Sequence, residues 1–307
     1  DKYYETLEDA VKNAVDGNTI VLLKDSSGNG IKVEANKFAT GLTIDFNTHT
    51  YTFNGKPVGS TGSETQAAHF ESGNKITLKN GKFNAAENSN VRILVQNYAE
   101  LTLSKMELDG TNVAQTGTNL FTLSCNNGNV VIEDSTIKAP AKATGVNHFA
   151  YAIDICGFAN YAGTSVTVKT TKNGTSLIDG NIRFYTDGAT TEHQLSLDLQ
   201  GGTVNGTLSL GGLSTKDKAK LSVTKDASVD VKAPSGYKWD DNGILVVDET
   251  ADDYVASVAG VKYQSLEDAI AAVGKDGTVY LNKDIETENG IFINNKEHFL
   301  LNLGDHT

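Results

Sequence analysis

The feature that most constrains the fold is a spacing of three apolar residues that recurs along the chain. An apolar residue is followed by a second two positions later and by a third seven positions after the first. The full pattern occurs at Ile44/Phe46/Tyr51, Ile76/Leu78/Phe83, Leu101/Leu103/Leu108, Val130/Ile132/Ile137 and Leu197/Leu199/Val204. Val166/Val168 and Leu221/Val223 begin it without completing it. The seven first positions are separated by 32, 25, 29, 36, 31 and 24 residues.

Each copy of this pattern predicts two strands joined by a corner. Alternating apolar residues share one face of a strand, and the third apolar residue follows a short polar insert, so it belongs to another strand. The inserts at 79–82 and 200–203 contain Asn or Gly, which suit left-handed corners. A period of 24 to 36 residues without intervening helices is typical of the coils of a parallel β-helix. An antiparallel sandwich would also show frequent turns, but it has no reason to repeat the pattern at one coil length.

The opening of the chain predicts a short helix at the first end of this solenoid. Leu7, Ala10, Val11 and Ala14 share one helical face, and Thr6 is a candidate N-cap. An open solenoid end exposes strand edges and core side chains. We therefore expect an all-β, right-handed, single-stranded parallel β-helix with a short N-terminal capping helix over residues 6–15.

An internal repeat predicts how the chain is divided. The segment at 4–11, Tyr-Glu-Thr-Leu-Glu-Asp-Ala-Val, returns at 263–270 as Tyr-Gln-Ser-Leu-Glu-Asp-Ala-Ile, and His49-Thr50 returns as His306-Thr307. We expect residues 1–257 to form one β-helix unit, and residues 258–307 to form the truncated start of a second copy, with a helix and its first strands. This second copy either caps the first unit or forms a small, separately ordered body. The start inside a repeat suggests an excised mature fragment.

Composition and charge exclude several classes of partner. The net charge of −12 and the pI near 4.9 argue against binding to nucleic acid or to anionic membranes. The sequence contains no run of 18 apolar residues, so we expect no membrane insertion of these residues. Cys125 and Cys156 are too far apart in sequence for a CxxC motif, and both buried free thiols and a disulfide remain open. The histidines are scattered singly, so we expect no metal and no cofactor.

Acidic residues on neighbouring coils are the candidates for catalysis on such a scaffold. Lyases and glycoside hydrolases need clustered or paired carboxylates, and the candidates are Asp45, Asp154, Asp179, Asp187 and Asp198. Solvated carboxylates at strand edges are the simpler interpretation. We assign no catalytic residue and expect no enzymatic activity.

Aromatic side chains are the candidates for ligand binding. The longest coil contains His148, Phe149, Tyr151, Phe158 and Tyr161, and long excursions from a solenoid often carry binding sites. A second group consists of Phe184, Tyr185 and Asp187. The alternative is that these aromatic rings cover a widened core.

The repeat also carries a resemblance to a known class of protein. The pattern Tyr-x-Thr/Ser-Leu-Glu-Asp-Ala, followed by Asp-Gly-x-Thr-Ile/Val and Leu-x-Lys-Asp, resembles right-handed β-helix repeats of large bacterial surface proteins. The resemblance implies the pectin-lyase-like superfamily and a secreted or cell-surface location. We expect a non-catalytic, monomeric module in a longer chain, which acts as a spacer or adhesin for host or bacterial glycans or surface proteins. The alternative is a polysaccharide lyase or glycoside hydrolase.

Overall fold

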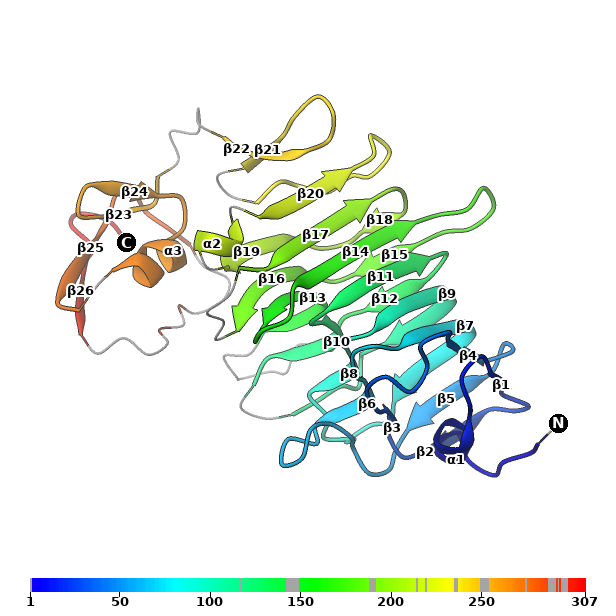
Figure 1. Cartoon of the computed structure of the whole chain (residues 1–307). Helices are drawn as coiled ribbons and strands as arrows, with labels where there is room; N and C mark the ends of the chain where they lie inside the picture. Colours follow the sequence, from blue (N-terminus) through cyan, green and yellow to red (C-terminus); the bar gives the residue numbers. More distant parts are fainter. Residues whose placement is uncertain are drawn as a thin grey trace. The chain divides into compact units, whose positions relative to one another are not determined.

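The computed structural model describes residues 2–115, 118–141, 149–187, 192–213, 215–218, 220–234, 237–248, 254–273, 275–286, 291, 293 and 298–307. It is 47% strand and 6% helix. The chain separates into two compact units, Asp1–Lys232 and Ala233–Thr307. The larger unit is a parallel β-solenoid of about 6 turns (Figure 1). The predicted all-β class and parallel β-helix are confirmed.

Two sheets of parallel strands form the walls of the solenoid. The main path of the thirteen-stranded sheet is β1 (Thr19–Val21), β4 (Leu42–Asp45), β7 (Lys75–Ala85), β9 (Glu100–Asp109), β11 (Gly128–Glu133), β14 (Gly163–Lys169), β17 (Gln194–Leu199) and β20 (Leu221–Lys225). Its shorter strands are β2 (Ser26–Gly28), β5 (Thr50–Phe53), β12 (Thr136–Lys138), β15 (Leu177–Asp179) and β18 (Thr203–Val204). The seven-stranded sheet is β3 (Ile31–Val33), β6 (Gln66–Phe70), β8 (Ile93–Asn97), β10 (Leu120–Cys125), β13 (Ala150–Phe158), β16 (Ile182–Asp187) and β19 (Leu208–Gly212).

The three-residue pattern lines the core between these walls. Its seven first positions lie one each in β4, β7, β9, β11, β14, β17 and β20. Every member of the five complete triplets exposes 8% or less of its surface. In three triplets the third member lies in a separate strand, β5, β12 or β18, whereas β7 and β9 each run through the corner and contain all three members. The corner residues Asn80, Gly201 and Gly202 have positive φ, as the inserts predicted. Each occurrence of the pattern therefore corresponds to one turn of the solenoid.

A helix covers part of the first end of the solenoid. Helix α1 (Leu7–Asn13) begins after Thr6, whose side chain accepts a hydrogen bond from the Asp9 backbone N–H at 3.0 Å. Its buried residues include Leu7 and Val11, and it packs beside β3. One further helix of this unit, α2 (Thr215–Lys218), was not predicted from the sequence.

The smaller unit contains the second copy of the opening segment. Its elements are β21 (Tyr237–Trp239), β22 (Leu245–Val247), β23 (Ala256–Val258), β24 (Val261–Tyr263), α3 (Leu266–Ala272), β25 (Gly277–Leu281) and β26 (Phe299–Asn302). Helix α3 has the same N-cap, because Ser265 accepts from the Asp268 N–H at 3.0 Å. The compact unit begins at Ala233, which lies upstream of the sequence repeat. The boundary at residue 258 rests on the repeat, and it remains a prediction.

The two copies also agree at a turn. His49 Nδ1 lies 3.3 Å from Asp25 Oδ1, and His306 Nδ1 lies 3.5 Å from Asp284 Oδ1. In each copy the same aspartate accepts the backbone N–H of the threonine that follows the histidine, at 2.9 and 2.8 Å. The repeated histidines therefore belong to a repeated turn.

The two cysteines are not joined by a disulfide. Cys125 and Cys156 are buried free thiols, and burial raises the pKa of each.

Among the residues that the structure describes, no helix has the length and apolar character needed to cross a membrane.

Candidate functional site

A row of polar side chains crosses one face of the seven-stranded sheet. Its members pair in register from strand to strand, and they are Lys32, His69, Gln96, Ser124, Asp154 and Arg183. Side chains alternate between the two faces of a strand. Ile153 and Ile155, on either side of Asp154, are fully buried in the core. The polar row therefore lies on the outer face of the sheet.

Hydrogen bonds join the middle of this row across neighbouring coils. Tyr98 Oη accepts from Gln96 Nε2 at 3.1 Å and from Asn126 Nδ2 at 3.0 Å. The Ser124 hydroxyl lies 2.9 Å from Asn126 Oδ1 and 3.2 Å from Asp154 Oδ2. Burial raises the pKa of Tyr98 to about 12, so its phenol stays protonated at neutral pH. These polar groups are held in place before any ligand binds.

The row continues through His69 to charged residues near the first end of the solenoid. His69 Nδ1 lies 3.2 Å from Gln96 Oε1, so the amide oxygen accepts from a protonated Nδ1. Burial lowers the pKa of His69, although the charge of Glu71 opposes this shift. Lys32 Nζ lies 3.2 Å from Glu71 Oε1. The imidazole is therefore a neutral hydrogen-bonding group at pH 7.

The other end of the row is a buried ion pair inside an aromatic surround. Arg183 Nε donates to Asp154 Oδ1 at 2.8 Å, and the two side chains are only 11% and 4% exposed. The guanidinium lies 4.6 Å from the Phe121 ring centre, 5.1 Å from that of Tyr151 and 4.3 Å from that of Tyr185. Burial by itself would lower the pKa of Arg183, but the charge of Asp154 outweighs it and raises that pKa.

The predicted aromatic residues of the longest coil fall into two groups. In the first, which we call the Arg183 group, Tyr151 stacks on Phe121 with 5.7 Å between ring centres, and Phe149 lies 6.1 Å from Tyr151. Tyr185 completes this group above the guanidinium. Tyr151 and Phe158 lie near opposite ends of β13, about 23 Å apart at about 3.3 Å per residue. The aromatic residues of the longest coil therefore lie in two separate places.

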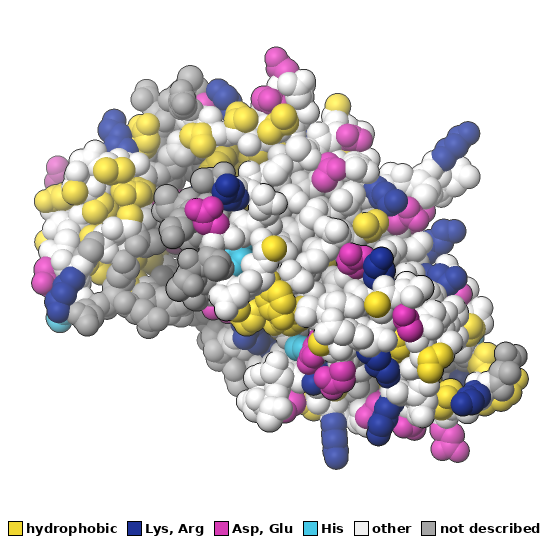
Figure 2. All heavy atoms as spheres, in the orientation of Figure 1, with side chains coloured by type: hydrophobic (Ala, Val, Ile, Leu, Met, Phe, Trp, Pro, Cys, Tyr) yellow, Lys and Arg dark blue, Asp and Glu magenta, His cyan; other side chains and the backbone are white. Residues whose placement is uncertain are grey.

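The second group, the Tyr98 group, consists of Tyr98, Phe158 and Tyr161. The Tyr98 ring centre lies 5.7 Å from that of Phe158 and 5.3 Å from that of Tyr161. Phe158 and Tyr161 are half-buried, so part of each ring faces solvent. Figure 2 shows hydrophobic side chains gathered near the middle of the solenoid, over the part where Figure 1 labels β13.

The remaining predicted site residues have different positions. Phe184 is fully buried on the core side of β16, so its proposed role in ligand contact is corrected to one in packing. Asp187 is exposed at the end of β16. His148 lies outside the described residues. The interpretation that aromatic rings fill the core holds for Phe184 but not for the half-buried Phe158 and Tyr161.

Sequence reasoning missed the polar row, although the sequence contains a signal for it. Segments such as Ile153-Asp154-Ile155 and Ile182-Arg183-Phe184 place one polar residue between two apolar ones, and they recur about one coil apart. The sequence also contains no sign that its two arginines approach the same ring. The guanidinium of Arg92 lies 5.4 Å from the Phe121 ring centre, and that of Arg183 lies 4.6 Å from it.

The five candidate catalytic carboxylates do not form one row. They are distributed over β4, β13, β15, β16 and β17, on two different sheets. Asp45 Oδ2 lies 3.2 Å from Lys79 Nζ, and Asp198 Oδ1 accepts from the Thr224 hydroxyl at 2.7 Å. Among the described residues, no three His, Cys, Asp or Glu side chains are grouped to hold a metal ion.

A cluster of four charges does form on strands β7, β9 and β12 of the thirteen-stranded sheet. Lys82 Nζ lies 2.7 Å from Asp109 Oδ2 and 3.3 Å from Glu107 Oε1, and Lys138 pairs with Glu107 as well. Partial burial would raise the pKa of Asp109, but hydrogen bonds from Lys82 and Thr111 outweigh it and lower the pKa to about 2. Burial opposes the corresponding shift in Lys82, yet its acidic partners raise its pKa. Both groups therefore stay charged at neutral pH.

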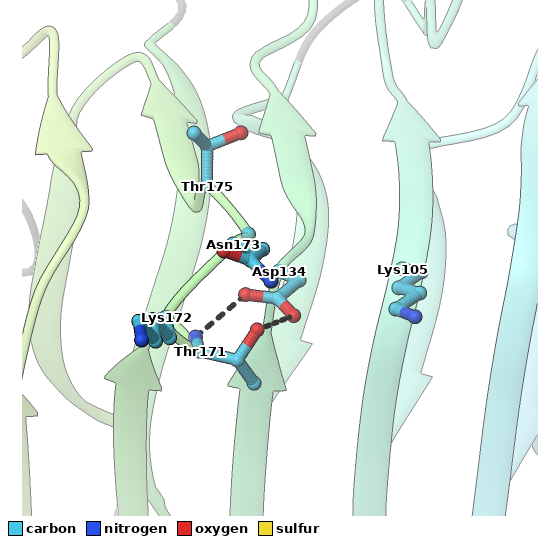
Figure 3. Close-up of a pocket in the computed structure, with 7 residues that line it drawn as sticks. Lys105, Asp134, Thr171, Lys172, Asn173 and Thr175 are labelled. Carbon is cyan, nitrogen blue, oxygen red and sulfur yellow. Dashed lines mark hydrogen bonds between the residues drawn. The ribbon is translucent and has the colours of Figure 1, made fainter.

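A hollow of about 510 Å³ lies at the corner that follows β11. It is lined by Lys105, Asp134 and residues 171–175. Asp134 accepts from the Thr171 N–H at 2.8 Å and from its hydroxyl at 2.6 Å, and these bonds lower the pKa of Asp134 (Figure 3). The carboxylate is turned toward the 171–175 loop, while Lys105 lies apart from it. The Asp134 carboxylate therefore attaches the 171–175 loop to the corner that follows β11.

Comparison with known proteins adds no relative to this description. No family model, no curated protein and no solved structure matches the chain.

Proposed function

We propose that the protein is a non-catalytic extracellular module of a repetitive surface protein, and that it binds glycans on the outer face of the seven-stranded sheet. The observation that carries this proposal is the Tyr98 group. Two half-exposed rings, Phe158 and Tyr161, lie beside a phenol that is fixed by the amides of Gln96 and Asn126. Apolar ring faces next to a few fixed polar groups suit a sugar, which presents both C–H faces and hydroxyl groups.

The solenoid scaffold supports the same proposal at a larger scale. Stacked coils place consecutive strands side by side, so equivalent positions form a surface that runs along the solenoid. Such a surface suits an extended polymer of repeating units. A pectin-lyase-like ancestry and a location at the cell surface are parts of this proposal.

The catalytic alternative has weaker support. A general acid must carry a proton near neutral pH, whereas lysines hold the pKa of Glu107 and Asp109 below their usual values. Asp154, on the proposed binding face, is buried and paired with Arg183. We therefore favour binding over hydrolysis or elimination.

Glycan-array binding by the parent protein and by a Phe158→Ala/Tyr161→Ala variant tests this function. We expect the parent to bind a subset of glycans and the variant to lose at least about tenfold in affinity, because both ring faces are removed. Tyr280→Ala, which removes a 49% exposed ring from the smaller unit, is the matched control and should bind as the parent does. Equal binding by parent and double variant, or no glycan binding by the parent, would refute the proposal.

A further inference from the structure

Two arginines approach one aromatic ring at the Arg183 end of the polar row. The guanidinium of Arg92 lies 5.4 Å from the Phe121 ring centre, and that of Arg183 lies 4.6 Å from it. They come from different coils, because Arg92 directly precedes β8 and Arg183 lies in β16. Burial lowers the pKa of Arg92, and the positive charge of Arg183 lowers it further. Holding the two cations near each other therefore costs free energy.

Most hydrogen-bond donors of the two guanidinium groups are unused. Each group carries five N–H donors. Arg92 Nε donates to Asn119 O at 3.2 Å. Arg183 Nε donates to Asp154 Oδ1 at 2.8 Å. The Nη donors of both side chains have no partner among the described residues. Arg183 is only 9% exposed, so little solvent reaches its remaining donors.

The local charges leave one cation without a counter-ion. Among the described residues, the carboxylate of Asp154 is the only one within ion-pair distance of either guanidinium. The segments 142–148 and 188–191, which adjoin β13 and β16 in sequence and lie outside the described residues, contain no Asp or Glu. Distant charges, which give the whole chain its net charge of −12, are screened beyond about 8 Å at physiological ionic strength. An unpaired positive charge therefore remains at Arg92.

Neighbouring groups hold the two guanidinium groups in place. Asn119 accepts from Arg92 Nε through its backbone oxygen, and its Oδ1 accepts from the Phe149 N–H at 3.2 Å. Arg183 is fixed by Asp154, and its guanidinium lies 5.1 Å from the Tyr151 ring centre. A guanidinium that is anchored through Nε presents its other donors as a rigid fork. Such a fork matches two oxygens of a carboxylate or sulfate group.

We propose that Arg92, beside Arg183, binds an oxyanion, and that the outer face therefore recognises a glycan that carries a carboxylate or a sulfate group. The anion would supply the missing negative charge and accept hydrogen bonds from the Nη donors. Arg92 is half-buried, so part of its side chain is open to solvent. The assignment to a glycan rests on the proposed function, whereas the oxyanion site itself does not.

Arginine-selective ¹⁵N NMR tests the oxyanion site directly, because Arg92 and Arg183 are the only arginines in the chain. Titration with sodium glucuronate or sodium sulfate, at an ionic strength held constant with sodium chloride, should shift the Nε–H signal of Arg92 saturably. Arg92→Gln removes this signal and so assigns it. Methyl glucoside, an uncharged sugar, is the matched control and should leave the signal unchanged.

The two anions also distinguish the source of the negative charge. A response to glucuronate alone would assign a sugar carboxylate, and a response to sulfate alone would assign a sulfate ester. The absence of a saturable shift with either anion, or an equal shift with methyl glucoside, would overturn the inference.

Oligosaccharides that differ only in charge test the assignment to a glycan. By calorimetry, the parent protein should bind a glucuronate-containing or sulfated oligosaccharide at least tenfold more tightly than its carboxyl-reduced or desulfated counterpart. Arg92→Gln should lose this preference while its circular dichroism spectrum stays unchanged. Lys75→Gln removes a 57% exposed lysine from the other sheet and is the matched control, which should bind as the parent does.

The outcomes separate this inference from the proposed function. If the parent binds the charged and neutral oligosaccharides equally well, the inference fails and the proposed function stands. If it binds neither oligosaccharide while the free anions still shift the Arg92 signal, the oxyanion site stands and the proposed glycan binding fails.

Discussion

At the scale of single residues, the outer face of the seven-stranded sheet shows how charged side chains can be buried outside the core. Asp154 accepts from Arg183 and lies within reach of the Ser124 hydroxyl, so its charge has partners despite a 4% exposed side chain. The guanidinium is in turn covered by aromatic rings. A buried ion pair of this kind adds little net stability. Removing only one partner is nevertheless strongly destabilising, because the other charge is then left buried without a counter-ion.

Removing one partner of this pair is expected to destabilise the protein strongly. Arg183→Met should lower the free energy of unfolding by about 3–5 kcal/mol, because Asp154 is left buried without its counter-ion. The double variant Arg183→Met/Asp154→Leu should lose less than the sum of the two single variants. Urea unfolding measures all three.

An exposed ion pair provides the control for this cycle. Lys75 and Glu100 lie 3.8 Å apart and are 57% and 54% exposed, so Lys75→Met should cost less than about 0.5 kcal/mol. Additive losses in the Arg183/Asp154 cycle would show that the two side chains do not depend on one another.

At the scale of strands and corners, charge pairs connect successive coils of the thirteen-stranded sheet. Lys82 from β7, Asp109 from β9 and Lys138 from β12 lie in consecutive coils, and Glu107 bridges the two lysines. Such a cluster stabilises coil stacking only while its carboxylates are ionised.

The acid dependence of stability follows from the lowered pKa of Asp109. Its pKa is about 2 in the folded protein against a usual value of 3.8, so its contribution is fully present above pH 3.8 and is lost as the pH falls toward 2. Asp109→Asn should therefore flatten the fall in the free energy of unfolding over this window, by about 1 kcal/mol once solvent screening is allowed for. Glu100→Gln, at an exposed site, should leave the slope nearly unchanged, and an equal effect of both variants would contradict the assignment.

The sequence predicted the strands whose positions follow from a single apolar period. It did not predict the features that depend on contacts between neighbouring coils. The three-residue pattern located the main strands and the Asn80 corner because core burial repeats with every turn. It did not reveal that Lys105 also adopts a positive φ of 54° at a corner, since lysine carries no preference for that conformation. The sequence singled out the aromatic residues of the longest coil as candidates, and their role in binding stays a prediction. It did not show that β13 separates them into two groups, because the two groups lie near opposite ends of that strand.

At the scale of the whole molecule, one opening segment occurs twice in different surroundings. Both copies have the same helix cap, the same strand register and the same Asp–His turn. In the second copy, strand β23 pairs antiparallel with β25 and covers its outer edge. Repetition thus supplies the scaffold, and the unequal coils between the copies supply the aromatic and polar groups proposed to bind a ligand.

Hydrogen exchange of the protein with its best-bound glycan tests most directly whether the outer face of the seven-stranded sheet is the binding face. We predict slower exchange in the segments 93–98, 120–126 and 150–161, which contain Gln96, Ser124 and Asp154 of the row together with the Tyr98 group, and unchanged exchange in the corner segments of the thirteen-stranded sheet. Protection confined to the corners or to the smaller unit would contradict the proposed binding face.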